Sequence, residues 1–353
     1  MTRHTRAKIF LIFGLALLGA GMMFAQQTFN TTIYFDYTAY FSNDGPVTSA
    51  AKNNFFAFRR AYFTYENKIN DNLKFRFRYD ADNTANLTSV DIKTGATKKD
   101  DKLRPYVKHI YLDYAGLLPN SSLKIGMTPT LTFESAEARW GYRSVAKTLL
   151  DGYTDITGVS IDASSADIGA SLTGSMAKFA RYGVMFYNGA GYSHPEGDKY
   201  KKIAGNVQLI PVAGLSIVGY MDYEKQDKDN SATTYKVDGY LEMIKNLVLG
   251  AEYFVYVNDK YLTAAKEQYD VSGLSIFGRY TLKPDVFSLF ARFDSYEPNT
   301  KSGDDEISLV IAGLDWAPFH KSMKLQPNIW YRTYANSDKK DDVVLNLTFF
   351  LSF

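Results

Sequence analysis

The chain has 353 residues, with 40 Lys and Arg against 38 Asp and Glu, and it contains no cysteine. The lack of cysteine excludes disulfides, zinc–thiolate sites and thiol nucleophiles. The near balance of charge gives no support for a nucleic-acid partner. Aromatic residues make up 15% of the chain, including 27 Tyr and 24 Phe, a usage typical of proteins with aromatic girdles at membrane surfaces.

The first 25 residues have the pattern of a secretory signal peptide. Arg3, Arg6 and Lys8 precede an apolar run, and Ala25 marks the expected cleavage site. The run is shorter than the roughly 20 apolar residues of a membrane helix, so a cleaved signal is favoured over a membrane anchor. Its removal takes away three basic residues and no acidic ones, leaving 37 against 38. We therefore expect an exported chain with one domain over 26–353.

The chain after residue 25 alternates between apolar and polar side chains and has no run long enough for a membrane helix. About sixteen segments of roughly 9 to 13 residues show this alternation, the length of a tilted strand that crosses the hydrocarbon. Short turns alternate with long polar loops, as periplasmic turns alternate with external loops in a transmembrane antiparallel β-barrel. The first five strands are expected near 31–41, 55–66, 73–82, 106–114 and 122–130. Tight turns are expected near 70–72, 118–120, 177–178, 212–214, 245–246, 283–285 and 321–322.

The strand count is ambiguous in one region, between residues 156 and 175. Residues 164–167 also suit a turn. A single long interrupted strand over 156–175 keeps the count even, as two termini on the same side of the membrane require. The sequence thus predicts an all-β barrel of about 16 strands.

Charged residues on the strands are expected to face the interior, because a charge on the lipid face at the bilayer midplane costs roughly 2 to 4 kcal/mol. Arg76, Arg78 and Asp80 alternate with aromatic residues and are the clearest case. The same argument predicts further pore-lining residues at Arg60, Lys124, Arg181, Asp222, Lys236, Asp238, Glu242, Glu252, Arg279, Arg292, Asp294 and Arg332. Arg59 and Arg60 cannot both face inward by strict alternation, so one is expected at a bulge, at the rim, or extended toward the membrane surface. Some sixteen strands enclose a lumen too wide for side chains to fill, which indicates a water-filled channel.

The segment over 131–155 differs from the hairpins around it. It is long, of mixed charge, and loosely helical in composition over 135–150. In a wide barrel such a connection, the third external loop, is expected to fold into the lumen and narrow it, because long connections in compact folds are usually functional. The expected constriction residues are Glu134, Glu137, Arg139, Arg143 and Lys147. A solvated external loop with a short surface helix is the alternative.

The last eleven residues, VVLNLTFFLSF, have an apolar face backed by Asn346, Thr348 and Ser352. A final strand that ends in an aromatic residue resembles the signature that the assembly machinery of bacterial outer-membrane barrels reads, which makes Phe353 its expected contact. An open sheet edge cannot persist in lipid, so this strand is expected to pair with the first strand, over 31–41.

Several segments, in order and spacing, resemble the phosphate-selective porin O and P family, and the likeness covers roughly residues 55–190. They are Phe58–Phe63, Leu73–Asp80, Ile110–Tyr114, Leu123–Pro129 and Thr157–Val159. The resemblance implies a sixteen-stranded, trimeric outer-membrane channel whose third loop folds inward and whose basic residues favour anions. The loop mixes both signs of charge and has no dense Lys cluster, so a general porin with slight anion preference is favoured over a strict phosphate filter.

We therefore expect a channel for small hydrophilic solutes or anions, surrounded by outer-membrane lipid, with no cofactor, bound metal or catalytic residue. One alternative is a channel for a specific organic substrate, such as a sugar or a hydrophobic compound. Another is a barrel enzyme, which needs a base beside a nucleophile. Only His109, His194 and His320 follow the signal segment, and each is expected to be a plain surface residue.

Overall fold

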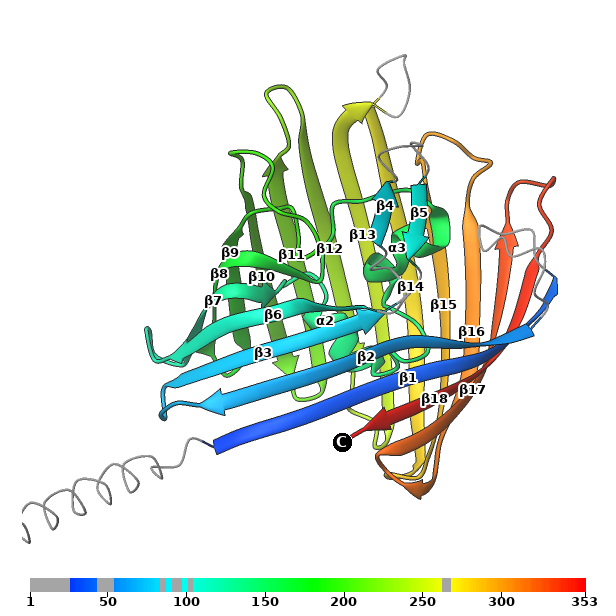
Figure 1. The fold of residues 1–353 in the computed structure, drawn as a ribbon, viewed down its shortest axis with the longest axis horizontal. Helices are drawn as coiled ribbons and strands as arrows, with labels where there is room; N and C mark the ends of the chain where they lie inside the picture. The colour runs from blue at the N-terminus through cyan, green and yellow to red at the C-terminus, as the bar shows by residue number, and fades with distance from the viewer. Residues whose placement is uncertain (1–25, 43–53, 83–86, 91–96, 101–103, 262–267) are drawn as a thin grey trace, which may run out of the picture.

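Sixteen strands form a closed antiparallel barrel in the computed structural model, which describes residues 26–42, 54–82, 87–90, 97–100, 104–261 and 268–353 (Figure 1). The predicted signal peptide over 1–25 and the predicted loop near 43–46 lie outside these residues. Each barrel strand is paired with its neighbours in an up-and-down order, and β1 is paired with β18. The predicted fold class, an all-β barrel of about 16 strands, is confirmed.

The elements follow the chain order of the hairpins. The barrel strands are β1 (Gln26–Ser42), β2 (Asn54–Lys68), β3 (Leu73–Asp82), β6 (Arg104–Ala115), β7 (Ser121–Pro129), β8 (Ala166–Ala177), β9 (Ala180–Tyr187), β10 (Lys202–Val212), β11 (Leu215–Lys225), β12 (Ser231–Leu241), β13 (Leu247–Tyr261), β14 (Gln268–Lys283), β15 (Phe287–Glu297), β16 (Ile307–His320), β17 (Met323–Tyr334) and β18 (Asp342–Ser352). A separate hairpin of β4 (Leu87–Val90) and β5 (Thr97–Asp100) lies between β3 and β6. Two helices, α2 (Glu134–Trp140) and α3 (Leu149–Thr157), lie between β7 and β8.

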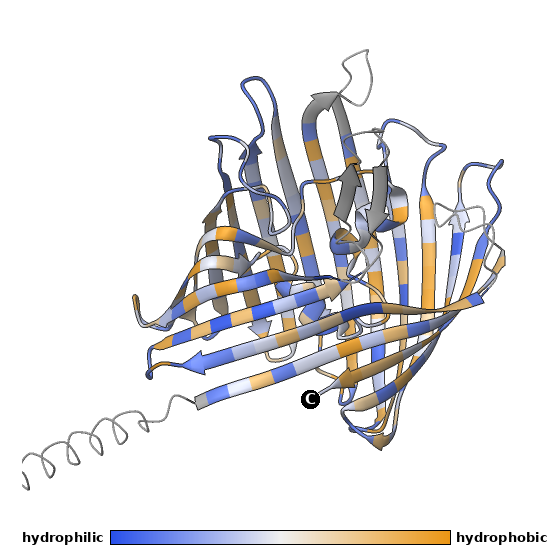
Figure 2. Ribbon diagram, in the orientation of Figure 1, coloured by the Kyte–Doolittle hydropathy of each residue, from blue (hydrophilic) through white to orange (hydrophobic). Residues whose placement is uncertain are grey.

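Burial alternates along the barrel strands, so successive side chains lie on an outer face and an inner face. Hydrophilic and hydrophobic residues alternate along the strands as well (Figure 2). The outward side chains are exposed and large, and they include Ile125, Val184, Phe186, Ile203, Ile217, Met221, Val237, Ile276, Phe293 and Val310. A soluble protein rarely leaves so continuous an apolar surface uncovered. The outer face is therefore the surface that meets hydrocarbon.

The short connections at one end of the barrel lie where the sequence predicted them. Three of them use a non-glycine residue with positive φ, at Asn120 (54°), Asn246 (67°) and Asp285 (60°). Asn and Asp tolerate this left-handed conformation better than other side chains because they hydrogen-bond locally. The predicted turns over 118–120, 245–246 and 283–285 are confirmed.

The seam between β1 and β18 closes the sheet. Phe35 faces Phe349 in the register, and their rings stack with centroids 4.7 Å apart. Thr31 and Phe353 exchange two backbone hydrogen bonds of 2.9 Å. Pairing at the seam satisfies the backbone groups of both terminal strands, as hydrocarbon requires. The predicted pairing of the last strand with the first is confirmed.

The long strand predicted over 156–175 is wrong. Helix α3 continues to Thr157 and ends at Gly158, whose φ of 75° is left-handed, and β8 begins only at Ala166. Ile156 and Ile161 are buried in the hydrophobic cluster inside the barrel. These residues are apolar because they pack the loop against the barrel wall, and they do not belong to an alternating strand.

A charge placed on the outer face should weaken the barrel more than the same charge inside it. Ile276 lies midway along β14 and is 54% exposed on the lipid face. We expect Ile276→Arg to lower the free energy of unfolding from liposomes by about 2–4 kcal/mol. The matched control is Gln208→Arg, which adds the same charge to an inner cavity and should cost less. Equal losses in urea titrations of the two variants would contradict the assignment of the faces.

Candidate functional site in the barrel interior

The connection between β7 and β8 packs against the inner face of one half of the barrel, and α2 and α3 contact strands β12 to β15 (Figure 1). Trp140 at the end of α2 has no exposed surface, and its ring lies 5.5 Å from Phe277 and 5.8 Å from Phe290. Tyr153 of α3 lies 5.3 Å from Phe254 in the same way. Aromatic contacts of this kind dominate the energetics of a packed core. The loop thus has its own hydrophobic core on the barrel wall.

Hydrogen bonds from the wall satisfy the loop backbone at several points. Arg292 donates to the Lys147 carbonyl (2.7 Å), and Glu252 accepts from the Leu150 amide (3.0 Å). Across the lumen, Arg59 donates to the Val145 carbonyl at 3.1 Å. Buried backbone groups need such partners, because leaving one unpaired costs about 1–3 kcal/mol. The loop is therefore held at both sides of the interior.

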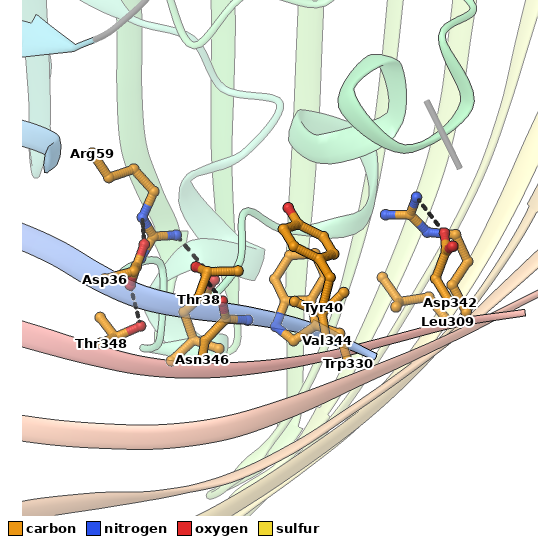
Figure 3. Close-up of a pocket in the computed structure, with 12 residues that line it drawn as sticks. Asp36, Thr38, Tyr40, Arg59, Leu309, Trp330, Asp342, Val344, Asn346 and Thr348 are labelled. Carbon is orange, nitrogen blue, oxygen red and sulfur yellow. Dashed lines mark hydrogen bonds and ion pairs between the residues drawn. The ribbon is translucent and has the colours of Figure 1, made fainter. Parts of the chain in front are cut away.

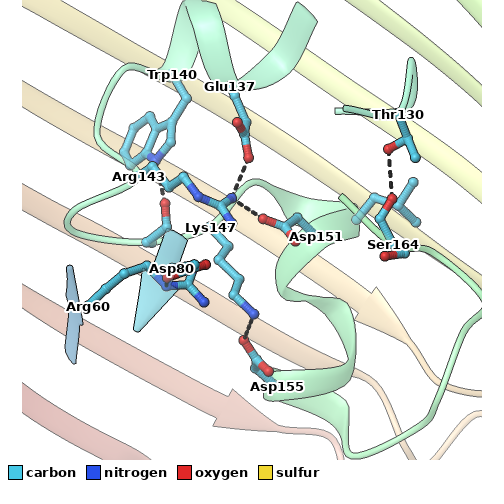
Figure 4. A network of polar contacts seen from close by, with 12 residues as sticks. Arg60, Asp80, Thr130, Glu137, Trp140, Arg143, Lys147, Asp151, Asp155 and Ser164 are labelled. Atoms are coloured by element: carbon cyan, nitrogen blue, oxygen red, sulfur yellow. Dashed lines mark hydrogen bonds and ion pairs between the residues drawn. The ribbon is translucent and has the colours of Figure 1, made fainter. Parts of the chain in front are cut away.

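A charged network stiffens the loop itself (Figure 4). Arg143 forms ion pairs with both Glu137 and Asp151, and Lys147 pairs with Asp155 at 2.7 Å. Burial opposes ionisation of Asp151, but Arg143 and Lys147 outweigh it and hold its pKa at about 2. For Glu137 burial prevails over Arg143, and its pKa is raised above the usual value. Glu137 therefore gains a proton more readily than Asp151 as the pH falls.

Five of the predicted pore-lining residues face inward but are covered by the loop. Each is at most 5% exposed: Lys236, Asp238, Glu252, Arg292 and Asp294. They neutralise one another, with Lys236 2.9 Å from Asp238 and Arg292 2.6 Å from Asp294. Their prediction as lumen residues in contact with water is therefore wrong. Alternation gives the direction of a side chain, whereas the loop that covers it comes from a distant part of the sequence.

Asp222 and Arg332 are also buried and hydrogen-bonded to neighbouring side chains. Asp222 accepts a hydrogen bond from the Tyr220 hydroxyl (2.7 Å), and Arg332 lies 3.5 Å from Asp342. Both are less than a tenth exposed. Asp222 is therefore a structural residue, whereas Arg332 lines a separate pocket at the seam.

Two β-bulges bring extra cations into the interior. The pairing of β1 with β2 skips Arg59, and the pairing of β3 with β6 skips Lys108. A bulge places two residues of one strand opposite a single partner, so consecutive side chains share a face. Arg59 and Arg60 both point inward as a result, and so do Lys108 and His109. The predicted bulge at the arginine pair is confirmed, whereas the expectation that His109 is a surface residue is wrong, because it is 5% exposed.

Cations and carboxylates interleave on the wall formed by β2, β3 and β6. Arg60 lies 2.6 Å from Asp82 and 3.3 Å from Asp80, and Lys108 lies 3.3 Å from the same Asp80. Asp80 has no exposed surface, so it neutralises these cations from behind. It does not present its charge to the lumen, contrary to its prediction as a pore-lining residue.

Arg78 lies beside these pairs without a carboxylate of its own. Its Nε atom donates to Thr64 at 2.8 Å, and its guanidinium lies 4.8 Å from the Tyr62 ring centroid. Among the described residues no acidic side chain lies within ion-pair distance of it. Arg78 therefore presents uncompensated positive charge.

An open chamber of about 230 Å³ lies between this wall and the loop. Its charged lining consists of Arg76, Arg78, Lys108, Arg143, Glu134 and Glu137. Predicted residues from the strands and from the loop thus meet here, although they are up to 67 positions apart in the sequence.

A larger cavity of about 680 Å³ continues toward the end of the barrel that carries the short turns. Arg139 and Arg181 line this cavity, and Glu134 lines both the cavity and the 230 Å³ chamber. Arg139 is 3.6 Å from Glu242, and Lys124 is 3.8 Å from Glu134.

Of two other predicted site residues, one belongs to the loop and the other contacts it. Lys147 forms an ion pair with Asp155 within the loop. Arg279 reaches Gly141 at the end of α2, where a Cβ would approach its guanidinium to 2.9 Å.

Lys108, Arg59 and Asp36 were missing from the list of site residues drawn from the sequence. Lys108 and His109 are consecutive polar residues within an alternating strand, the same signal that marked Arg59 and Arg60. That signal was sufficient to find Lys108. No such break in the alternation marks Asp36. Its part in the site depends on the ion pair with Arg59, which lies 2.8 Å away in the folded chain.

Two further observations concern the residues that the structure describes. None of their helices is long and apolar enough to cross a membrane. No group of three or more His, Cys, Asp or Glu side chains among them is arranged to hold a metal ion.

Solved structures that share this closed barrel fold include outer-membrane channels and porins. No family model matches the chain, and no curated protein matches it. The outer-membrane channel DcaP of Acinetobacter baumannii has a TM-score of 0.64 at 12% identity, over 93% of this chain and 97% of that chain. An anion-selective porin from Comamonas acidovorans also has a TM-score of 0.64, at 9% identity over 94% and 100%. Salmonella typhi OmpF, in complex with daunomycin, has a TM-score of 0.61 at 12% identity over 93% and 98%.

At these identities the likeness shows the shared fold. The resemblance of residues 55–190 to the phosphate-selective porin family remains a prediction.

Removal of the Trp140 ring should release the loop from the wall. We expect Trp140→Ala to cost about 3–5 kcal/mol of docking energy, as for other buried aromatic truncations. Trypsin should then cleave the folded, detergent-solubilised protein after Arg139, Arg143 or Lys147, and mass spectrometry would identify the fragments. The control is Trp316→Ala, because Trp316 is 45% exposed on the outer face. Equal protease resistance of wild type and Trp140→Ala would contradict this role.

Proposed function

We propose that the chain is an outer-membrane channel through which small hydrophilic solutes and ions diffuse passively, with a weak preference for anions. The observation that carries this proposal is the chamber between the loop and the wall. There the cations Arg76, Arg78, Lys108 and Arg143 outnumber the carboxylates Glu134 and Glu137. Charged side chains that line a pore set its ion selectivity.

The preference for anions is weak because most of the positive charge is matched. Arg76 lies 3.2 Å from Glu66, Lys108 shares Asp80 with Arg60, and Arg143 is held by two loop carboxylates. Arg78 is the one chamber cation for which the described residues include no carboxylate partner. A binding site that held phosphate tightly would need several such groups, and a channel must also release its solute.

Positive and negative side chains lie mainly on opposite sides of the chamber. The wall contributes Arg76, Arg78 and Lys108, whereas the loop contributes Glu134 and Glu137 with a single cation, Arg143. A field directed across the path orients solutes that have a dipole, since charged clefts with low-dielectric walls focus field lines. Small dipolar solutes are therefore part of the proposed substrate class.

The setting of the channel is proposed on the same basis. We propose that the barrel lies in the outer membrane. We further propose that residues 1–25 form a signal peptide and that Phe353 is recognised by the assembly machinery. The sequence pattern and the barrel fold support these proposals. One of the similar structures, OmpT of Vibrio cholerae, is described in a trimer form. We propose a homotrimer for this chain also. DcaP is an outer-membrane channel and the Comamonas acidovorans protein is a porin, and these similarities favour a channel over a barrel enzyme.

Planar-bilayer recordings test the proposal directly. The purified protein should give discrete conductance steps, and the reversal potential in a KCl gradient should indicate weak anion preference. Arg78→Glu replaces the unmatched cation by an anion, so we expect it to shift the reversal potential toward cation selectivity.

Lys228→Glu is the matched control, because Lys228 is exposed on the connection between β11 and β12. It makes the same change of charge outside the chamber and should leave the reversal potential nearly unchanged. An electrically silent bilayer would disprove the channel. An equal shift in the two variants would disprove the role of the chamber.

The ion preference should depend on pH through Glu137. Burial raises the pKa of this carboxyl, so acidification from neutral to about pH 5 increases its neutral fraction. The loss of one of the two chamber carboxylates should strengthen anion selectivity as the pH falls. Glu137→Gln should show the acidic behaviour already at neutral pH and respond less to acid. Glu242→Gln, outside the chamber, should keep the response of the wild type.

A further inference from the structure

A separate pocket lies along the barrel seam (Figure 3), and Arg59 and Val145, which are hydrogen-bonded to each other, both line it. It encloses about 160 Å³, and its lining residues come from β1, β2, β16, β17, β18 and the loop. Asp36 and Arg59 lie at one end, and Arg332 and Asp342 lie at the other. The size suits a small solute.

The charges of this pocket are balanced at both ends. Arg59 lies 2.8 Å from Asp36, and Arg332 lies 3.5 Å from Asp342. An anion that entered would meet two carboxylates, and a cation would meet two guanidinium groups. Neither sign of charge gains a net attraction, so the field of the pocket favours a neutral ligand.

Polar and apolar groups alternate between these two ends. Thr38 donates to the Asn346 side-chain oxygen at 2.7 Å, and Tyr40 and Trp330 stand beside them (Figure 3). The Trp330 indole nitrogen is already occupied by Asn328 at 3.0 Å, so its ring contributes an apolar face. A ligand that fits this lining has several hydroxyl groups and an apolar C–H face.

Arg332, which lines the pocket, has a buried donor without a hydrogen-bond partner. The Nε atom of Arg332 forms no hydrogen bond within the described structure, although only 7% of the residue is exposed. Burial of this charged donor without a hydrogen bond is unfavourable. A ligand oxygen at this position would remove the cost.

We propose that the seam pocket binds a small neutral polyhydroxylated solute of monosaccharide size. The carboxylates of Asp36 and Asp342 accept hydrogen bonds from its hydroxyl groups, and Arg332 donates to a hydroxyl oxygen. The apolar face of the ligand packs on Trp330 and Tyr40. The pocket is part of the wall, so binding at equilibrium does not require that the barrel conducts.

Fluorescence of the refolded protein in detergent tests this site without any measurement of transport. The chain has three tryptophans, and Trp330 is the one that lines the pocket. D-Glucose should change the emission saturably with a Kd on the order of millimolar, and Trp330→Phe should abolish the change. Glucuronate and protonated glucosamine carry a negative and a positive charge on the same pyranose skeleton, and each should bind at least about tenfold more weakly than glucose, because each meets a like charge.

Asn346→Leu removes the central amide and keeps the reporter tryptophan. It should weaken glucose binding about tenfold, the equivalent of one or two lost hydrogen bonds. Asn206→Leu makes the same substitution in the opposite cavity and should leave binding within about twofold. A heat-modifiability gel would verify that each variant is folded.

Three results would overturn the proposal: no saturable change with glucose, equal affinity of wild type and Asn346→Leu, or tighter binding of glucuronate or glucosamine than of glucose. If the protein conducts in bilayers but its fluorescence does not respond to glucose, the proposed binding site is disproved and the proposed channel function is not. Glucose binding by a barrel that does not conduct would do the reverse.

Discussion

The packing of Trp140 between Phe277 and Phe290 is the interaction on which the organisation of the interior depends. It fixes α2 against β14 and β15, and the rest of the loop follows, through Tyr153 on Phe254 and the hydrogen bond from Arg292 to Lys147. A barrel of sixteen strands would otherwise be too wide for its side chains to fill. Because the loop occupies one half of the interior, the open space remains as separate chambers along the other half and the seam.

The loop also decides which inward charges meet water. Behind it, Lys236 and Glu252 compensate each other in a dry region, where an unpaired charge would be expensive to bury. In front of it, Arg78 remains accessible and has no acidic partner among the described residues. The same type of residue on the same type of strand therefore acts as a structural ion pair in one place and as a lumen group in the other.

The fold was largely predictable because the two faces of a membrane strand meet different surroundings, hydrocarbon outside and the barrel interior inside, and the sequence alternates accordingly. Alternation located the hairpins, Asn246 and Asp285 marked tight turns, and the last strand was correctly paired with the first. Prediction failed over 156–175, where apolar residues pack against a distant part of the chain and have no local period. The consecutive cations at Arg59 and Arg60 were the informative exception, because a break in the alternation marked a real bulge.

The sequence by itself determined the barrel, its approximate strand count and the inward direction of nearly every charged side chain predicted to line it, because these properties follow from a period of two and the high cost of charge in hydrocarbon. Only the tertiary structure decided which of those charges are accessible, which pairs neutralise each other, and how the interior is divided. Accessibility and pairing depend on contacts such as Arg59 with Val145 and Arg143 with Asp151. The contact between Arg59 and Val145 joins residues that are 86 positions apart, and no local pattern encodes such a meeting.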